Sequence, residues 1–411
     1  MTTPTTLVAV RPDGGYAPDF AVRVSGKPLD EGTHNDIRDI RVVLDNSNMA
    51  SFNLTINNWD DSKLRFKYSE QDNEVFDTGN TVEISLGYGG QLIPVAAGTI
   101  TTMQPYFPDA AAPNIAISGT DGLQKLKERK PPPDEPVIYR DKADWQIAQI
   151  IARRHNLPFQ ADEQGPVWPE VIQRRHQDDA TFLMERATRI DFECYIRVDP
   201  KSGVSTLHFR SPTDGRQAVS GSQGARVCVL AYGPGLAGDA DRQRALLARA
   251  QGPVGQVQSL VPNLLSFTPT LTLRQQVSSV TVRGWNPRTK QPISYEATAR
   301  DLPSGQGRSG PGAATSGLAG RQEAVIDAPV ASDEEAQRLA IALLRERSYA
   351  FISGTGRIAG LPELRPGDNV EIHGIGRRFS GSYYVLTVEH NVSIAGFFTQ
   401  FGCRRIYDGT R

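Results

Sequence analysis

Apolar and polar residues alternate with a period of two along much of the first 120 residues. Phe20, Val22 and Val24 show the pattern first, and it recurs at residues 40–44, 52–56 and 82–86. Turn residues separate these segments, as in the Gly-Tyr-Gly-Gly run at 87–90. Such alternation between turns predicts antiparallel strands with one buried face. We therefore expect a β-barrel or sandwich here, with further strands near 99–103 and 115–118.

Beyond the proline-rich stretch at residues 130–136, the apolar spacing becomes helical. One predicted helix begins at Asp141 as its N-cap and ends before Pro158. A second follows Asp178, and a hairpin follows at residues 194–209. Consecutive prolines resist both helix and sheet, so they mark a boundary. Residues 137–215 are thus predicted to be a small α/β module.

The second half of the chain returns to the strand pattern after a weaker helix predicted at residues 239–250. Ser332 and Glu335 form a capping box, which begins a helix predicted over 332–347. The glycine-rich segment 303–320 has one large apolar residue, so we expect a flexible surface loop there.

These patterns predict a mainly β fold with an α/β insertion. A first β-barrel domain is expected at residues 1–129, the module at 137–215, a linker with a helix at 216–265, and a second β-barrel domain at 266–411.

Charge and composition narrow the possible functions. Lys and Arg number 45 against 46 Asp and Glu, and this balance argues against nucleic-acid binding. No apolar run reaches the ~20 residues that a membrane span needs. Cys194, Cys228 and Cys403 lie far apart in the sequence, so we expect reduced thiols rather than a disulfide framework.

Candidate chemistry is sparse. The six histidines occur singly, without the spacing of a metal site. The carboxylate pair at 178–179 suits a helix N-terminus, and the pair at 60–61 suits a turn. Residues 307–311 lack the last glycine of a nucleophile elbow. We expect no catalytic residue, no metal and no cofactor, and hence a protein that is not an enzyme.

Several segments resemble one family in the correct order along the chain. They lie at residues 76–88, 98–101, 115–123, 178–183, 282–291, 360–368, 379–383 and 388–390. Together they resemble the late control D family of contractile-tail hub proteins, whose fold also forms the hub region of VgrG-type spike proteins. The residues that carry the resemblance are Gly79, Gly87, Tyr88, Gly98, Asp121, Phe182, Leu183, Gly284, Trp285, Pro287, Pro366, Gly367, Asp368, Gly381, Tyr383 and His390.

The resemblance implies a homotrimer with two related barrels in each chain. Its pseudo-six-fold ring would join a hexameric inner tube to a trimeric spike in the baseplate of a phage tail or injection particle. Expected partners are the inner tube ring, baseplate wedge or LysM-type adaptor proteins, and a spike that is a separate polypeptide because the chain ends at Arg411. The protein would be made in the bacterial cytoplasm, with no membrane span and no nucleic-acid partner.

Two other functions remain open at this stage, a tail-associated cell-wall hydrolase and a carbohydrate-binding β protein. Two further expectations follow from the hub hypothesis. Trp285 should be buried between strands or subunits, so that Trp285→Ala weakens folding or trimer formation. Deletion of much of 303–320 should leave the barrel folded, because shortening a loop costs little.

Overall fold

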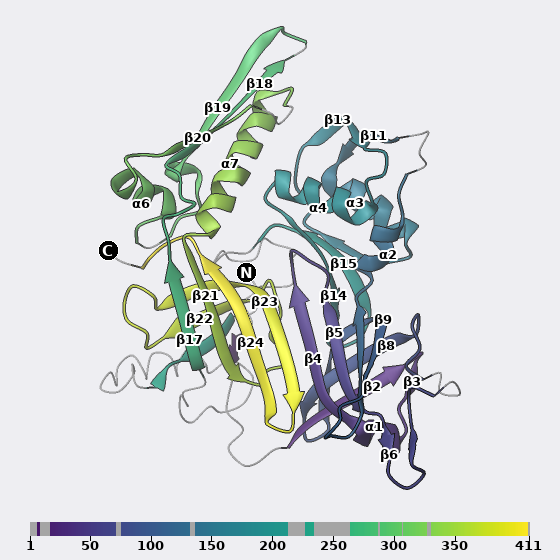
Figure 1. Cartoon of the computed structure of the whole chain (residues 1–411). Coiled ribbons are helices and arrows are strands. Elements are labelled where there is room, and N and C mark those ends of the chain that lie inside the picture. Colours follow the sequence, from purple (N-terminus) through teal and green to yellow (C-terminus); the bar gives the residue numbers. More distant parts are fainter. Residues whose placement is uncertain are drawn as a thin grey trace.

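The computed structural model describes residues 6–8, 17–70, 75–131, 136–212, 227–233, 264–286, 288–305, 307–326 and 330–409 (Figure 1). Four hydrophobic cores divide the fold into a first β unit, an α/β module, a second β unit, and an insertion within the second unit. The expected mainly β class with an α/β insertion is confirmed. None of the described helices has the length and apolar composition needed to cross a membrane.

The first β unit is built from strands that alternate inward and outward side chains. Phe52, Leu54 and Ile56 of one strand are all less than 5% exposed, as the period of two predicts. The elements are β2 (Pro18–Val24), β3 (Lys27–Pro28), α1 (Glu31–Asp36), β4 (Ile37–Asp45), β5 (Ser51–Asn57), β6 (Trp59–Asp60), β7 (Arg65–Phe66), β8 (Thr81–Tyr88), β9 (Gln91–Tyr106) and β10 (Asn114–Thr120).

The α/β module contains the two predicted helices and the predicted hairpin. Asp178 caps the second helix, since its carboxylate accepts a bond from the Thr181 N–H at 2.7 Å. The first helix does not begin at Asp141, which lies in a strand with φ of 50°. The elements are α2 (Leu123–Glu128), β11 (Val137–Ala143), α3 (Asp144–Arg154), β12 (Phe159–Ala161), β13 (Val167–Gln173), α4 (Asp179–Arg189), β14 (Glu193–Val198) and β15 (Ser205–Arg210).

The second β unit consists of β1 (Thr6–Val8), β16 (Val227–Ala231), β17 (Leu264–Leu271), β21 (Ile352–Ala359), β22 (Asn369–His373), β23 (Gly381–Ser393) and β24 (Gly396–Arg405). Its insertion contains β18 (Ser279–Asn286), β19 (Gln291–Thr298), the 3₁₀ turn Ala299–Asp301, α6 (Gly310–Gly317), β20 (Gln322–Val325) and α7 (Asp333–Tyr349). The helix predicted over 332–347 is α7, and Ser332 caps it. The helix predicted at 239–250 lies outside the described residues.

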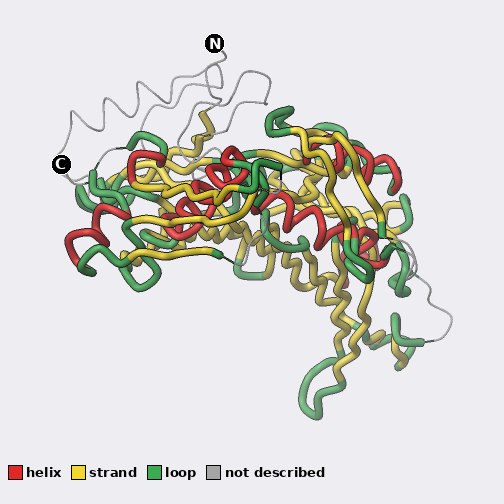
Figure 2. Tube along the Cα trace, turned by 90° about the horizontal axis from the view of Figure 1, so that it is seen from above, coloured by secondary structure: helices red, strands yellow, loops and turns green. Residues whose placement is uncertain are grey.

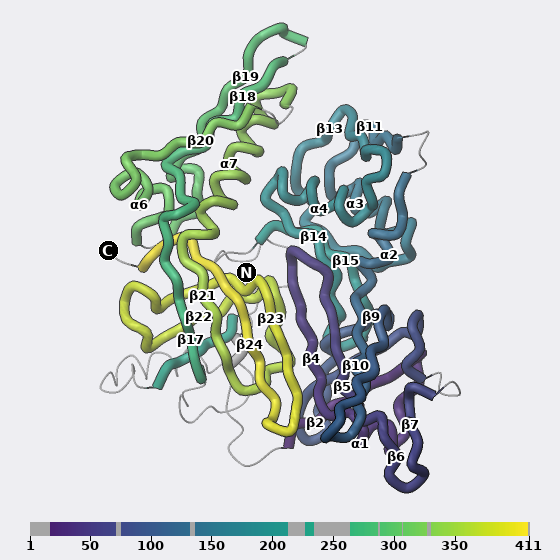
Figure 3. The backbone as a smooth tube through the Cα atoms, in the orientation of Figure 1, coloured from purple at the N-terminus to yellow at the C-terminus, as the bar shows by residue number. Residues whose placement is uncertain are grey.

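The two β units share one sheet. Eight antiparallel strands follow one another in the order β17, β21, β24, β23, β4, β5, β10, β9. The purple β4 lies beside the yellow β23 in Figure 1, and β10 is labelled beside β5 and β9 in Figure 3. Among the described strands no sheet closes on itself, so each unit is an open part of a shared sheet rather than a closed barrel.

Residues 303–320 are not a loop throughout. They contain α6, whose Ala313 and Ala314 are fully buried and whose N-terminus is capped by the Ser309 hydroxyl. The sequence predicted a loop because small side chains give no apolar periodicity. Small side chains instead allow this helix to approach its neighbours closely: a methyl group on Gly310 would lie 1.9 Å from Gln276 Oε1.

The module and the insertion both project from the same end of the shared sheet (Figure 1). In the view from above, the helices in red overlap the strands in yellow (Figure 2). The opposite end carries turns and the short β6–β7 hairpin.

Candidate assembly interface

The two β units repeat one strand arrangement. Strands β4, β5, β10 and β9 lie side by side in the first unit, and β17, β21, β24 and β23 lie side by side in the second. In each set the strands come first, second, fourth and third along the chain. The third strand of the second unit, β23, pairs with the first strand of the first unit, β4. The shared sheet is therefore two copies of one unit placed in tandem.

Irregularities in the strands fix the correspondence residue by residue. One residue is skipped in the pairing of each first strand, Arg38 in β4 and Leu265 in β17. One residue is likewise skipped in each third strand, Thr101 in β9 and Leu386 in β23. Because all pairs agree under one alignment, the repeat holds at the level of single residues.

Two of the family-signature glycines occupy one repeated turn. Gly79 donates its N–H to the Ile100 carbonyl at 2.8 Å, and Gly367 donates to the Val385 carbonyl at 2.8 Å. The φ angles are +93° and +88°, values that glycine adopts readily and other residues rarely do. Ile100 and Val385 correspond to each other in the strand alignment. The two glycines are thus the same residue of the repeat.

The internal junction between the units combines an apolar face and a polar face. On the polar face, Arg41 of β4 donates two bonds to the Glu389 carboxylate of β23, at 2.8 and 2.9 Å. Asn391 donates to Asp39 at 3.0 Å on the same face. Side chains on the opposite face, such as Val388, belong to the hydrophobic cores. The junction is a continuation of both cores.

Further contacts lock the second unit onto the β8–β9 region of the first. The Arg365 guanidinium is buried and donates to the Pro94 carbonyl at 2.8 Å. The Tyr88 hydroxyl donates to the Gly360 carbonyl at 3.1 Å, and its ring lies 5.6 Å from the Phe397 ring. Tyr88 therefore connects the two units through a hydrogen bond and an aromatic contact.

Two buried titratable residues, His390 and Asp121, form hydrogen bonds inside the fold. His390 is fully buried and contacts the Thr399 hydroxyl at 3.0 Å, and burial beside Arg365 holds its pKa well below the ordinary value. The Asp121 carboxylate accepts bonds from the Ala50 and Leu123 N–H groups. Burial nevertheless raises the pKa of Asp121 to about 6.

The remaining signature residues are spread over the fold. Pro366 and Asp368 flank Gly367 in the repeated turn, Gly381 and Tyr383 lie at the start of β23, and Gly87 and Gly98 lie in β8 and β9. Phe182 and Leu183 are buried in the module core, and Phe182 also lines a cleft that Gly284 and Trp285 line from the insertion. Pro287 lies outside the described residues. The structure thus brings together the signature residues of the two β units, and it places Phe182, Gly284 and Trp285 around one cleft between the module and the insertion.

Trp285 is not buried within the chain, contrary to the first half of our expectation. Its side chain is 55% exposed, because it lies in the outer part of β18 rather than in a turn. It lines a cleft of about 900 Å³ between the insertion and β13 of the module, where Ile326 and Ile172 are also exposed.

Two strand edges of the shared sheet have no partner among the described residues. In β9, residues 91–99 pair with β8, whereas among the described strands residues 102–106 pair only with β10 and Thr101 is skipped. At the other end of the eight strands, β17 pairs only with β21. Exposed edges of this kind can accept a strand from another chain. The alternation of apolar and polar residues did not identify these two edges.

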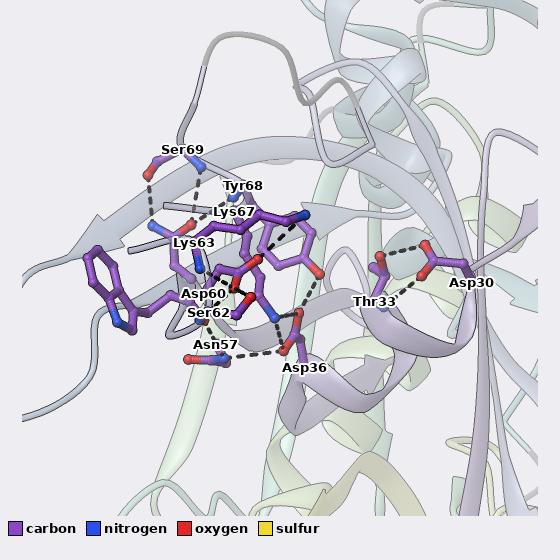
Figure 4. Close-up of polar contacts among 12 residues, drawn as sticks. Asp30, Thr33, Asp36, Asn57, Asp60, Ser62, Lys63, Lys67, Tyr68 and Ser69 are labelled. Atoms are coloured by element: carbon purple, nitrogen blue, oxygen red, sulfur yellow. Dashed lines mark hydrogen bonds and ion pairs between the residues drawn. The ribbon is translucent and has the colours of Figure 1, made fainter. Parts of the chain in front are cut away.

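A network of polar contacts holds the β6–β7 hairpin near the end of the β9 edge (Figure 4). The buried Asp36 carboxylate binds Lys67 Nζ at 2.8 Å and accepts a bond from the Tyr68 hydroxyl at 2.7 Å. Asn58, fully buried, accepts from the Tyr68 N–H at 2.8 Å. The Asp60 carboxylate accepts from Ser62, and this bonding lowers the Asp60 pKa. These carboxylates order the hairpin.

The hairpin places an aromatic cluster beside the edge. The Trp59 ring lies 5.4 Å from the Phe66 ring, which lies 5.1 Å from the Phe107 ring. Phe107 is 55% exposed and follows directly after the last residue of β9. The free edge of β9 therefore ends in an exposed aromatic surface.

Other candidate chemistry has a structural explanation in the described ranges. No group of three metal-ligating side chains occurs among them. Asp179, of the second carboxylate pair, is buried and contacts His155 Nε2 at 2.8 Å and Arg154 Nη1 at 3.3 Å. Its partner Asp178 is the helix cap described above.

Comparison with known proteins gives a family and a fold. A family model described as the Alg8 N-terminal domain matches residues 17–204 and 251–393. Among curated proteins, no sequence matches.

Solved structures of tail proteins share the fold at low sequence identity. A 43 kDa tail protein of prophage MuSo2 from Shewanella oneidensis is 12% identical, with a TM-score of 0.63 over 95% of this chain and 98% of that one. A tail protein from Neisseria meningitidis MC58 is 12% identical, with a TM-score of 0.62 over 95% and 97%. An E. coli protein described as a component of the type VI secretion system is 11% identical, with a TM-score of 0.52 over 95% and 78%.

Proposed function

This chain belongs to the Alg8 N-terminal domain family, and from its tail-protein fold we propose that it is a structural baseplate hub of a contractile tail or injection particle. Three copies form a ring of six β units, which joins a hexameric inner tube to a three-fold spike. The protein acts by assembly and catalyses no reaction. Its partners are the tube ring, a separate spike protein, and baseplate wedge or LysM-type adaptor proteins.

The tandem repeat is the observation that carries this proposal. The internal junction joins the third strand of one unit to the first strand of the other. The counterparts of these two strands, β9 and β17, have edges without a partner among the described residues, at opposite ends of the eight antiparallel strands. Joining β9 of one copy to β17 of the next therefore repeats the internal junction. A head-to-tail contact of this kind forms a closed ring when its rotation closes.

The two ends of the sheet suit partners of different symmetry. One end carries the β9–β10 and β23–β24 turns at corresponding positions of the two units, so six corresponding turns alternate around the ring, and the β6–β7 hairpin is added to the first unit alone. The other end carries the module from one unit and the insertion from the other (Figure 1). These parts differ, so that end presents three-fold symmetry only. A six-fold tube fits the first end, and a three-fold spike fits the second.

Light scattering on the purified chain tests the ring. The expected mass is three times the 44.9 kDa chain mass. Negative-stain class averages should show six similar densities around a pore. A species that stays monomeric at high concentration, alone and with its tube protein, would contradict the hub function.

A further inference from the structure

The internal junction also specifies how two copies would meet, residue by residue. We propose that residues 101–106 of one copy pair antiparallel with β17 of the next copy, with Pro105 opposite Pro269. This inference rests on the proposed ring and adds its contact surface and register. The partner is a second copy of this chain.

The register follows from the alignment of the repeats. Inside the chain, Val42 of β4 lies opposite His390 of β23. Val42 corresponds to Pro269, because they pair with corresponding residues of β5 and β21. His390 corresponds to Pro105 by the same comparison of β23 with β9. Transferring the internal pairing to two copies therefore places the two prolines opposite each other.

Both prolines point their nitrogen atoms toward the free edge. Ile100 forms both of its backbone bonds with the turn at 79–80, away from β10. Because residues of a strand alternate in direction, with one skipped residue at Thr101, Pro105 also faces away from β10. The corresponding bonds of Val385 place Pro269 away from β21. Proline is tolerated at such positions because no partner inside the sheet requires its N–H.

The proposed register confines the missing bonds to one position. Two residues that cannot donate face each other, so no N–H is left without an acceptor there. The neighbouring outward-facing pair, Met103 and Leu271, can exchange both backbone bonds. Before assembly, the same prolines interrupt the donors on each free edge, which limits pairing with unrelated strands.

The residues of β9 and β17 that correspond to the internal junction form complementary surfaces without charged side chains. The internal ion pair of Arg41 and Glu389 has Thr268 and Gln104 as its counterparts. On the core-facing side, the half-buried Met103 comes opposite the half-buried Leu271. The exposed Phe107 follows Met103 on this side, close to Phe267 of the next copy. The contact between copies is therefore apolar on one face and polar without charge on the other.

A disulfide between copies tests the register. Gln104 comes opposite Thr270, at a separation that a disulfide can span. The three native cysteines are buried, so they do not compete. Oxidation of the Gln104→Cys, Thr270→Cys variant should link copies covalently and stop at the trimer on denaturing gels.

The matched control keeps Gln104→Cys and moves the second cysteine to Ser266. Four residues of displacement separate these positions by roughly 13 Å, so this variant should give no covalent trimer. If trimers form by light scattering but the first variant does not cross-link, the edge pairing is overturned and the hub function is not. Equal cross-linking of both variants also overturns the register.

A new ion pair gives a second test that needs no oxidation. Gln104→Glu combined with Thr268→Arg recreates the internal Arg–Glu pair between copies. We expect tighter trimer association with a coupling of about two- to five-fold per junction, lost at high salt. Thr102→Glu combined with Thr268→Arg is the control, and it should show no coupling. Coupling in the control alone would overturn the proposed register.

Discussion

At the residue scale, the repeated turn explains the glycines at positions 79 and 367. Each glycine lies in the segment that follows the second strand of its unit, and it donates its N–H to a carbonyl of the third strand. The sequence contained one visible trace of this repeat, the identical Val-Glu-Ile at residues 82–84 and 370–372. Three residues are too few to indicate a duplication, whereas matching hydrogen bonds and bulges show it.

Alanine at either glycine should lower the free energy of unfolding. Gly79→Ala should cost about 1–3 kcal/mol from backbone strain alone, since no atom lies within 4 Å of the new methyl group. Gly367→Ala should cost more, because the methyl group would lie 3.1 Å from Arg197 Nη2 and 3.2 Å from Asn46 Nδ2. Urea denaturation measures both. Gly26→Ala, at an open turn with φ of +76°, is the control.

Asp121 should make stability depend on pH. Its folded-state pKa of about 6 lies above the ordinary value of 3.8, so the folded protein holds the proton more tightly than the unfolded chain. The contribution to stability, about 3 kcal/mol, is present at low pH and lost as the pH rises through about 4 to 6. Asp121→Asn removes this titration but loses one backbone bond. The stability difference between the two proteins should therefore shrink from pH 4 to pH 7, and a constant difference would contradict the assignment.

At the element scale, strong periodicity and caps predicted what the structure contains. The hairpin at 87–90, the capped α4 and the capped α7 were all found from local sequence. The α6 helix was missed because its residues are small, and the tertiary contacts that stabilise it are not local. Trp285 is exposed within the chain because it lies in the outer part of β18, and its burial between subunits stays a prediction. The predicted domain limits remain a prediction.

Deletion of residues 310–317 should destabilise the second β unit, which reverses the expectation for a loop. The helix buries Ala313 in the core of that unit, so its removal exposes apolar side chains and leaves a cavity. We expect insoluble protein or a fall of several °C in Tm, measured by circular dichroism. A deletion variant as stable as the wild type would show that α6 contributes nothing to the core.

At the scale of the whole molecule, a shared sheet makes the two β units one mechanical body. Strand pairing, the Arg41–Glu389 ion pair and the Arg365 contact all cross the same boundary. None of these contacts is visible in the sequence, because the residues lie 271 positions apart for Arg365 and Pro94 and 348 for Arg41 and Glu389. Local patterns therefore predicted two β regions but not their union.

The contacts at this boundary should differ in energy. Arg365→Ala should cost about 2–4 kcal/mol, because it removes a buried guanidinium and leaves the carbonyl groups that it contacts, including the partly buried one of Pro94, without this donor. Arg41→Ala should cost less than about 1 kcal/mol, since the Arg41 side chain is 55% exposed. Guanidinium denaturation of both variants measures the difference. Equal costs would mean that the buried guanidinium does not hold the units together.

The tandem repeat also has an evolutionary consequence. Two linked copies of an ancestral unit can diverge separately, whereas six identical subunits must change together. In the proposed ring, a substitution in this chain would alter three of the six positions, so one half can acquire a helical appendage while the other keeps the shape that the ring requires. The different attachment points of the module and the insertion record this freedom: one follows the last strand of its unit, and the other interrupts the path between the first two strands.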